Sequence, residues 1–303
     1  MTDMRLSNEI GKVLSTWPIL YPKEPQNVWI SNEFTNAVVL HITKNQLNNA
    51  QVNTPLILAI QGGTGEGKSF QVKEICSRMK ANVLSVSGAM LSGSYERESL
   101  DVLMSAYIYA SHIKKTSKRP TVLLIDDFDL SVASTFEDRG YTVNSQLLSG
   151  FLMNLADDPT QCGQEKTYRI PIIVTGNNFH PLHAPLRRHG RMNIFEWQPS
   201  IEQKIRMVRS IFNFESTTDL QELDDLVKKY AQEPIAFFAS LKNDVVDEAI
   251  LQTINREGRI NVNIISHVVE NVLMSISVSM LKKVAKARHQ VEIRDYLNYN
   301  EEL

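Results

Sequence analysis

The sequence predicts an α/β domain built on a parallel sheet, followed by an all-helical domain. Two observations carry this prediction. Up to about residue 199, short apolar runs alternate with segments of helical periodicity, as in an open parallel sheet flanked by helices. From residue 200 onward only helical periodicity remains. We therefore expect a short N-terminal segment over residues 1–53, an α/β domain over 54–199 and a helical domain over 200–303.

The strands of the predicted sheet are apolar runs, and the first of them, Pro55–Ile60, is apolar throughout, as in a parallel strand covered on both faces. Further strands are expected at residues 81–87, 121–125 and 170–175, with a short strand near 194–197. Helices are expected at residues 34–42, 68–79, 98–114 and 144–157 in the first domain, and at 201–212, 219–231, 234–254 and 262–287 in the second.

The bulk composition is that of an ordinary globular protein, with 43% hydrophobic and 22% charged residues in a chain of 303. The net charge of −2 argues against an electrostatic trap for nucleic acid or anionic membranes, although local basic patches stay possible. The only two cysteines, Cys76 and Cys162, form no CxxC pair, so neither a structural disulfide nor zinc is expected.

The N-terminus has neither the apolar core of a signal peptide nor the character of a transit peptide. The apolar stretch Ile264–Leu281 is interrupted by polar residues and is interpreted as a buried or amphipathic helix instead of a membrane span. We expect a cytoplasmic protein, in the bacterial cytosol or in the stroma of an organelle after removal of a presequence.

A glycine-rich loop follows the first strand and leads directly into a helix. Its sequence, GGTGEGKS, matches the P-loop pattern, in which glycines let backbone N–H groups face phosphate oxygens. Lys68 is expected to reach the β- and γ-phosphates of ATP, and the Ser69 hydroxyl to bind Mg²⁺. The expected nucleotide-binding residues here are Gly62, Gly63, Thr64, Gly65, Glu66, Gly67, Lys68, Ser69 and Phe70.

Two acidic residues, Asp126 and Asp127, end the apolar strand at 121–125. In P-loop enzymes an acid at this place holds Mg²⁺, and its neighbour can polarise the attacking water. Strand-terminal Asp pairs are also common turn residues, so this signal gains its strength from the P-loop that precedes it. Asp129 is interpreted as a surface or loop residue.

Two further polar groups follow the predicted sheet strands. Asn177 follows the strand at 170–175 and can position the lytic water, although a Gly-Asn turn is the plain alternative. Arg188 and Arg191 stand in the run PLRRHGR and form either an anion patch or arginine fingers that act on the ATP of a neighbouring subunit. Fingers acting in trans would imply a ring or helical assembly.

The P-loop, the Asp pair, the strand tip and the arginine pair, followed by helices, resemble the AAA+ ATPases. Several sequence blocks narrow the resemblance to Rubisco activases of the green type, among them YTVN and MNLADDPT, which lie outside the generic nucleotide machinery. The blocks are HITKN, PLILAIQGGTGEGKSFQ, YTVNSQLLSGFLMNLADDPT, RIPIIVTGNNF, APLRRHGRM and FFASLKNDVVDE.

This resemblance implies a P-loop AAA+ core with a helical lid, assembled as a hexameric ring that uses ATP and Mg²⁺. It implies that ATP hydrolysis releases inhibitory sugar phosphates from Rubisco, the protein client. It assigns Asp126 to the metal, Asp127 to catalysis and Asn177 to sensing the γ-phosphate. Arg188 and Arg191 correspond to the arginine fingers. Lys242 corresponds to a second sensor arginine, whose guanidinium fork a lysine lacks.

Three alternatives remain open. The segment Ser92–Ser99 resembles the family's pore loop only loosely, which favours a different protein client; Tyr95 in it is either a substrate-gripping aromatic or an exposed turn residue. An AAA+ assembly that loads nucleic acid is disfavoured by the neutral charge balance. A nucleotide-gated scaffold without turnover is disfavoured because both strand-end acids and the arginine pair are present.

Overall fold

The computed structural model describes residues 19–20, 24–47, 53–91, 98–129, 143–180, 182–258 and 260–299; in 19–20, 98, 143–145 and 289–299 it describes the backbone alone. The chain divides into two compact units, Met1–Gln198 and Pro199–Leu303. The predicted class, a parallel sheet flanked by helices and followed by a helical region, is confirmed.

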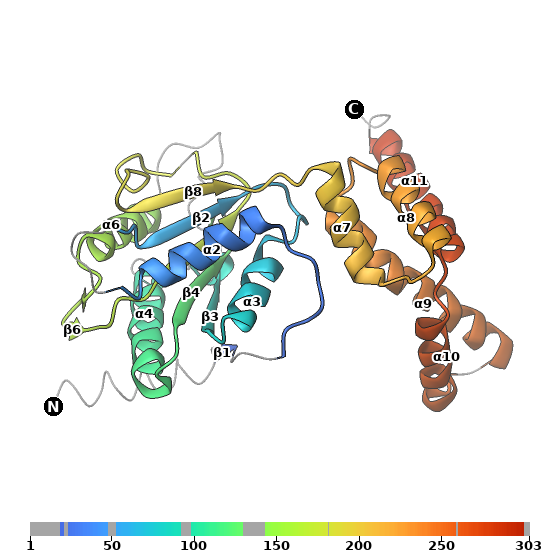
Figure 1. Cartoon of the computed structure of the whole chain (residues 1–303), viewed down its shortest axis with the longest axis horizontal. Coiled ribbons are helices and arrows are strands. Elements are labelled where there is room, and N and C mark those ends of the chain that lie inside the picture. The colour runs from blue at the N-terminus through green and yellow to red at the C-terminus, as the bar shows by residue number, and fades with distance from the viewer. Residues whose placement is uncertain are drawn as a thin grey trace. The chain divides into compact units, whose positions relative to one another are not determined.

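The first unit contains a sheet of six strands in the order β1-β3-β4-β7-β2-β8 (Figure 1). All neighbouring strands are parallel except β1, which pairs with β3 in the antiparallel sense. The strand β2, which leads into the glycine loop, lies between β7 and β8. The strands are β1 (Ile19–Leu20), β2 (Ile57–Gln61), β3 (Asn82–Ser87), β4 (Thr121–Asp126), β7 (Ile172–Gly176) and β8 (Met192–Glu196).

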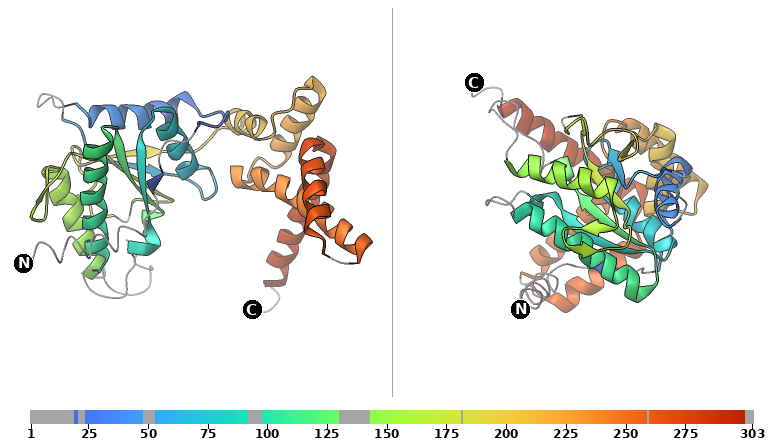
Figure 2. Two further views of the ribbon diagram at one scale, coloured as in Figure 1. Left: turned by 90° about the horizontal axis from the view of Figure 1, so that it is seen from below. Right: turned by 90° about the vertical axis from the view of Figure 1, so that its left-hand side faces the viewer.

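Helices cover both faces of this sheet (Figures 1 and 2). The helices α2 (Asn32–Lys44) and α3 (Lys68–Arg78) lie together on one face, and α4 (Glu98–Ser117) and α6 (Val143–Asp157) lie together on the other. The central strands β2, β4 and β7 are mostly apolar and buried, as a sheet covered on both faces requires. The described part of the unit also contains a short helix η1 (Gly88–Leu91) and a small hairpin, β5 (Gln161–Cys162) with β6 (Glu165–Lys166).

The parallel arrangement brings the carboxyl ends of the strands to one edge of the sheet. Gln61 is in register with Gly176 of β7 and with Glu196 of β8, and Ser87 of β3 is in register with Asp126 of β4. The polar residues that follow these strands in the sequence therefore meet at this edge. Open α/β sheets place their ligands in this position.

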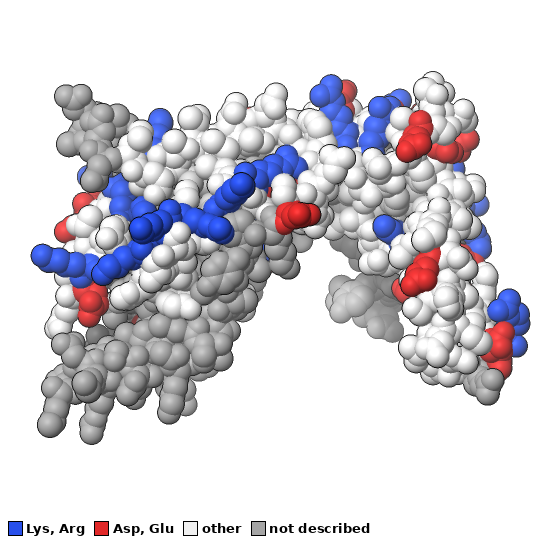
Figure 3. All heavy atoms as spheres, turned by 60° about the horizontal axis from the view of Figure 1, so that its bottom comes forward, with Lys and Arg blue, Asp and Glu red and all other residues white. Residues whose placement is uncertain are grey.

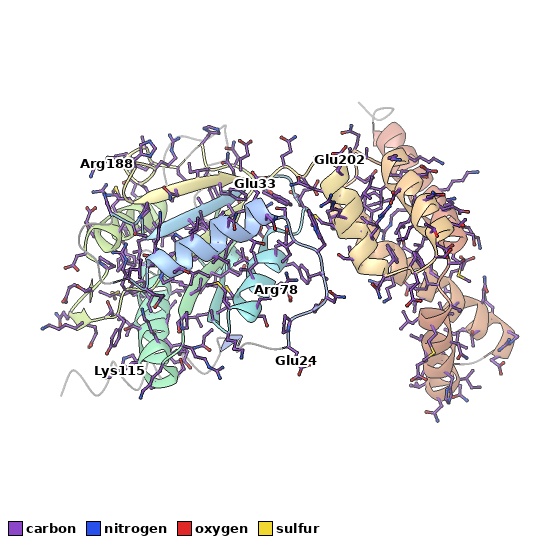
Figure 4. The ribbon with its side chains drawn as sticks, viewed as in Figure 1. Glu24, Glu33, Arg78, Lys115, Arg188 and Glu202 are labelled. Atoms are coloured by element: carbon purple, nitrogen blue, oxygen red, sulfur yellow. The ribbon has the colours of Figure 1, made fainter. Side chains whose placement is uncertain are left out.

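The surface of the first unit carries a local concentration of positive charge in spite of the net charge of −2. Figure 3 shows Lys and Arg side chains following one another across one side of this unit, with few acidic side chains between them. Arg78 and Lys115, at the ends of α3 and α4, lie toward this side in Figure 4. Exposed cations near these helix ends are Arg78, Lys80, Lys115, Lys118 and Arg119.

The second unit is helical, with α7 (Ile201–Phe212), α8 (Thr217–Lys229), α9 (Ile235–Glu257), α10 (Val262–Met274) and α11 (Val278–Tyr299). The single helix expected over residues 262–287 is wrong, because residues 275–277 separate two helices, α10 and α11. There the Ser275 hydroxyl donates to the Asn271 carbonyl at 2.7 Å, and serine side chains that bond the backbone in this way favour helix ends.

Within the described part of the chain, no single helix is both long and apolar enough to cross a membrane. The pair α10 and α11 meets the criteria of length and composition only when taken together, and it is bent by 107°.

Candidate nucleotide-binding site

The glycine loop joins the end of β2 to the start of α3, as the P-loop pattern predicts. Gly65 and Gly67 have φ angles of 76° and 73°, in the left-handed region that favours glycine. Gly62 is required for a different reason, since a Cβ atom there would lie 2.1 Å from the Trp197 carbonyl oxygen. The indole of Trp197 donates a hydrogen bond of 2.9 Å to the Glu66 carbonyl, which holds the loop against the end of β8.

Lys68 is buried at the start of α3, with its amine inside the loop. The amine donates to the carbonyls of Gly62 and Gly63 at 2.7 and 2.8 Å and lies 3.4 Å from the Asn177 Oδ1. Burial lowers the pKa of Lys68, while the nearby acids Asp127, Asp129 and Glu66 act in the opposite direction. Phe70, two residues after Lys68 in α3, is 47% exposed.

Thr175, a fully buried residue near the end of β7, links three of the predicted site residues. Its hydroxyl lies 3.1 Å from the Ser69 hydroxyl and 3.3 Å from the Asp126 Oδ1. The same oxygen accepts a hydrogen bond of 3.3 Å from the backbone N–H of Asp127. The two residues expected to bind Mg²⁺ and the one expected to act on water are therefore connected through one hydroxyl, which sequence reasoning missed.

Asp127 occupies a strained backbone position. Its φ angle is 53°, which non-glycine residues rarely adopt and which costs on the order of 1 kcal/mol or more. Its carbonyl packs against Gly88, where a Cβ atom would lie 2.0 Å from that oxygen. The residue is exposed at the edge of the sheet, so its carboxylate is accessible to a ligand.

The side chain of Asn177 faces the glycine loop, and its Oδ1 accepts a hydrogen bond of 3.1 Å from the Thr64 hydroxyl. The backbone N–H of Asn177 donates to the Asp129 Oδ2 at 2.8 Å. The interpretation of Asp129 as a surface or loop residue is therefore wrong: it is half-buried and braces the strand tip that carries Asn177.

The three arginines of the PLRRHGR run have different surroundings. Arg191 forms a two-pronged ion pair with Asp157 at the end of α6, with N–O distances of 2.8 and 2.5 Å, and also donates to the Pro185 carbonyl at 3.0 Å. The Asp157 partner raises the pKa of Arg191, and that hydrogen bond lowers the pKa of Asp157. Arg187 donates to the Leu182 carbonyl at 3.1 Å.

Arg188 differs from both neighbours. It is exposed, and Figure 4 shows it on the turn before β8 with its side chain pointing away from the sheet. Among the residues that the structure describes, none forms a hydrogen bond or ion pair with its guanidinium. The turn itself is closed by the Arg191 N–H, which donates to the Arg188 carbonyl at 3.1 Å.

Two predicted features, Lys242 and the segment with Tyr95, are not among the residues described at this site. Lys242 is half-buried in α9 of the second unit, and the first unit alone holds the residues above. The segment predicted as a pore loop, with Tyr95, lies outside the described residues, apart from its last two positions at the start of α4.

The oxygen atoms around Thr175 suit a magnesium ion. The set consists of two hydroxyls and one carboxylate, and Mg²⁺ prefers oxygen ligands, with the phosphates of a nucleotide and water completing its coordination. No cluster of three or more His, Cys, Asp or Glu side chains occurs in the described ranges, so a dedicated protein cage for a metal is not seen there. Ser69 and Asp126 would hold the ion together with the nucleotide.

Comparison with known families divides the chain in two. Residues 58–200 match the ATPase family associated with various cellular activities (AAA). Residues 201–293 match the helical family of ribulose bisphosphate carboxylase/oxygenase activases.

Individual relatives align over a longer stretch than either matched region alone. The chain is 36% identical over 242 residues to the ribulose bisphosphate carboxylase/oxygenase activase of Anabaena sp., an alignment that covers 78% of this chain and 58% of the relative. It is 35% identical over 246 residues to the activase of Nostoc sp., covering 78% and 59%. It is 35% identical over 236 residues to the chloroplastic activase of Phaseolus vulgaris, covering 76% and 53%.

The chain thus spans somewhat more than half the length of these curated relatives. The two family matches and the alignments to activases agree with the resemblance to Rubisco activases that the sequence blocks show. Residues 58–200 therefore form an AAA domain, and residues 201–293 a helical domain of the Rubisco activase type.

Proposed function

We propose that this chain binds ATP at the glycine loop and hydrolyses it at the edge of the sheet beside β4 and β7. The observation that supports this most is the position of the Thr175 hydroxyl. It lies within 3.3 Å of the Ser69 hydroxyl, the Asp126 Oδ1 and the backbone nitrogen of Asp127. These residues come from α3, from the end of β4 and from β7. Together they supply the groups that phosphate binding, metal binding and water activation require.

In this proposal the residues Gly62 to Phe70 bind the nucleotide, with backbone N–H groups and the α3 N-terminus facing the phosphates. Lys68 leaves the loop carbonyls that it now contacts and pairs with the phosphates instead. Mg²⁺, held by Ser69 and Asp126, would neutralise phosphate charge. Asp127 accepts the proton of the attacking water, and Asn177, fixed by Asp129, orients that water. Lys242 is the candidate for a second contact with the nucleotide.

We further propose that the chain assembles into a ring, most simply a hexamer, in which each site is completed by an arginine of the neighbour. Arg188 is the better candidate for direct contact, because it is exposed and no described side chain holds it. Arg191 and Asp157 give the turn its shape. Guanidinium at a transferring phosphate stabilises developing negative charge and is worth roughly a thousandfold or more in turnover.

The proposed client is Rubisco, since the relatives bear the name ribulose bisphosphate carboxylase/oxygenase activase. ATP turnover in the ring would loosen active sites that inhibitory sugar phosphates block. The relatives are cyanobacterial and chloroplastic proteins, which supports a place of action in the bacterial cytosol or in the stroma.

Two variants test the ATP chemistry. Lys68→Ala should abolish nucleotide binding, because it removes the cation at the phosphates. Asp127→Asn should bind a fluorescent ATP analogue as tightly as the wild type but hydrolyse ATP at least about a hundredfold more slowly, the usual contribution of a general base. An Asp127→Asn protein with wild-type turnover would refute the role given to Asp127.

The client is tested by adding the protein and ATP to Rubisco inhibited by a sugar phosphate. Rubisco that regains no carboxylation activity would refute the assignment of Rubisco as the client.

A further inference from the structure

The Asp126 carboxylate is bound by a cation of its own chain, from an element that sequence reasoning did not connect with the site. Lys73 of α3 places its amine 2.9 Å from the Asp126 Oδ2. Ser85 of β3 donates to the same oxygen at 3.4 Å. Both side chains of the ion pair are only partly accessible, 36% for Lys73 and 20% for Asp126, so solvent screens their interaction incompletely.

The two oxygens of this carboxylate therefore face different partners. Oδ2 is taken by Lys73 and Ser85, whereas Oδ1 faces the hydroxyl of Thr175 and, through it, Ser69. Lys73 lies four residues beyond Ser69, on the same face of α3 one turn along the helix. The helix α3 thus places the Ser69 hydroxyl at the proposed metal position and, through Lys73, binds the Asp126 Oδ2 on the other side of the carboxylate.

This arrangement has an electrostatic consequence. A carboxylate paired with an ammonium presents less negative potential to a second cation than a free carboxylate does. An ammonium that contacts one oxygen of Asp126 also repels a divalent ion bound near the other oxygen. Lys73 should thus weaken the binding of Mg²⁺ while it keeps Oδ1 turned toward Thr175.

We propose that Lys73 is a positioning residue that sets the Mg²⁺ concentration needed for nucleotide binding at this site. The proposal rests on the proposed function, since it requires ATP and Mg²⁺ at the glycine loop. It concerns how much Mg²⁺ the site needs, and the binding of nucleotide without the metal should not depend on Lys73, which makes no contact with the loop among the described residues.

The test measures binding of a fluorescent ATP analogue at increasing Mg²⁺, and separately in EDTA. Lys73→Gln removes the charge and keeps a polar side chain that is one atom shorter. It should lower the Mg²⁺ concentration for half-maximal binding about three- to tenfold, the effect of one unit charge at a partly exposed site. Lys73→Arg keeps the charge and should stay within about twofold of the wild type.

Lys80→Gln is the matched control, because it removes the same charge from an exposed position just beyond the end of α3. It should leave the Mg²⁺ requirement unchanged, and all three variants should bind the analogue in EDTA as the wild type does. A Lys73→Gln protein with an unchanged or higher Mg²⁺ requirement would overturn the proposal, as would an equal shift in Lys80→Gln. A wild type that binds no analogue in either condition would overturn the proposed function itself, and the proposal with it.

Discussion

We expect His41 of α2 to make the stability of the α/β unit depend on pH. The imidazole is buried, and its Nε2 lies 3.1 Å from the Ile172 carbonyl of β7. Because a carbonyl can only accept a hydrogen bond, Nε2 carries the hydrogen. Burial lowers the pKa of His41 from 6.5 to about 4; the carbonyl partner opposes this shift and the charge of Arg169 adds to it.

The sign follows from which state binds the proton first. Between pH 6.5 and about 4 the unfolded chain protonates His41 while the folded chain keeps it neutral, so stability is full above pH 6.5 and falls as the pH drops through this window. At about 1.4 kcal/mol for each tenfold change in proton affinity, the whole window amounts to roughly 3 kcal/mol. Between pH 7.5 and 5, where most carboxylates stay ionised, the loss is about 2 kcal/mol.

The assay is urea unfolding followed by tryptophan fluorescence at pH 7.5 and pH 5. All three tryptophans of the chain, Trp17, Trp29 and Trp197, precede Pro199, so their emission reports the first unit. The control is His41→Gln, which can still donate to the Ile172 carbonyl but does not titrate. The wild type should lose about 2 kcal/mol more than this variant between the two pH values. Equal losses in the two proteins would refute the reasoning.

Two further substitutions test contacts at the site. Thr175→Val keeps the shape of a buried side chain but removes the hydroxyl that joins Ser69 to Asp126. It should lower the free energy of unfolding in urea by about 1–2 kcal/mol and slow ATP turnover at least tenfold. Unchanged turnover would contradict the role of this hydroxyl. Asp157→Ala releases Arg191. Because the Asp157 side chain is 53% exposed, stability should change by less than about 1 kcal/mol, while ATP turnover should fall. Turnover equal to that of the wild type would show that the turn needs no such clamp.

Much of the site could be predicted because parallel strands bring their carboxyl ends to one edge. Once the run before Asp126 and the run before Asn177 are interpreted as neighbouring strands, their closeness to the glycine loop follows from topology alone. The backbone geometry of the glycine loop could also be predicted, because Gly65 and Gly67 adopt the left-handed conformations that glycine favours.

The residues that were missed look ordinary in the sequence. Thr175 is a β-branched residue in a strand, which its β propensity explains without any function. Lys73 is a polar position on a helix, and most such lysines face solvent. The different surroundings of Arg188 and Arg191 depend on Asp157, which lies in another element and whose distance from them no local pattern encodes. The helix break at Ser275 was hidden because apolar spacing continues on both sides of it.

If one active site is shared by two subunits, a mixture of two inactive variants tests this sharing most directly. Lys68→Ala subunits cannot bind ATP but keep Arg188, and Arg188→Ala subunits bind ATP but lack the finger. Each protein alone should hydrolyse ATP at a small fraction of the wild-type rate. In a mixture, sites formed between an Arg188→Ala subunit and a Lys68→Ala neighbour have both parts, so ATP hydrolysis should reappear well above the sum of the two separate rates. A mixture that forms mixed assemblies and yet shows only that sum would contradict the account.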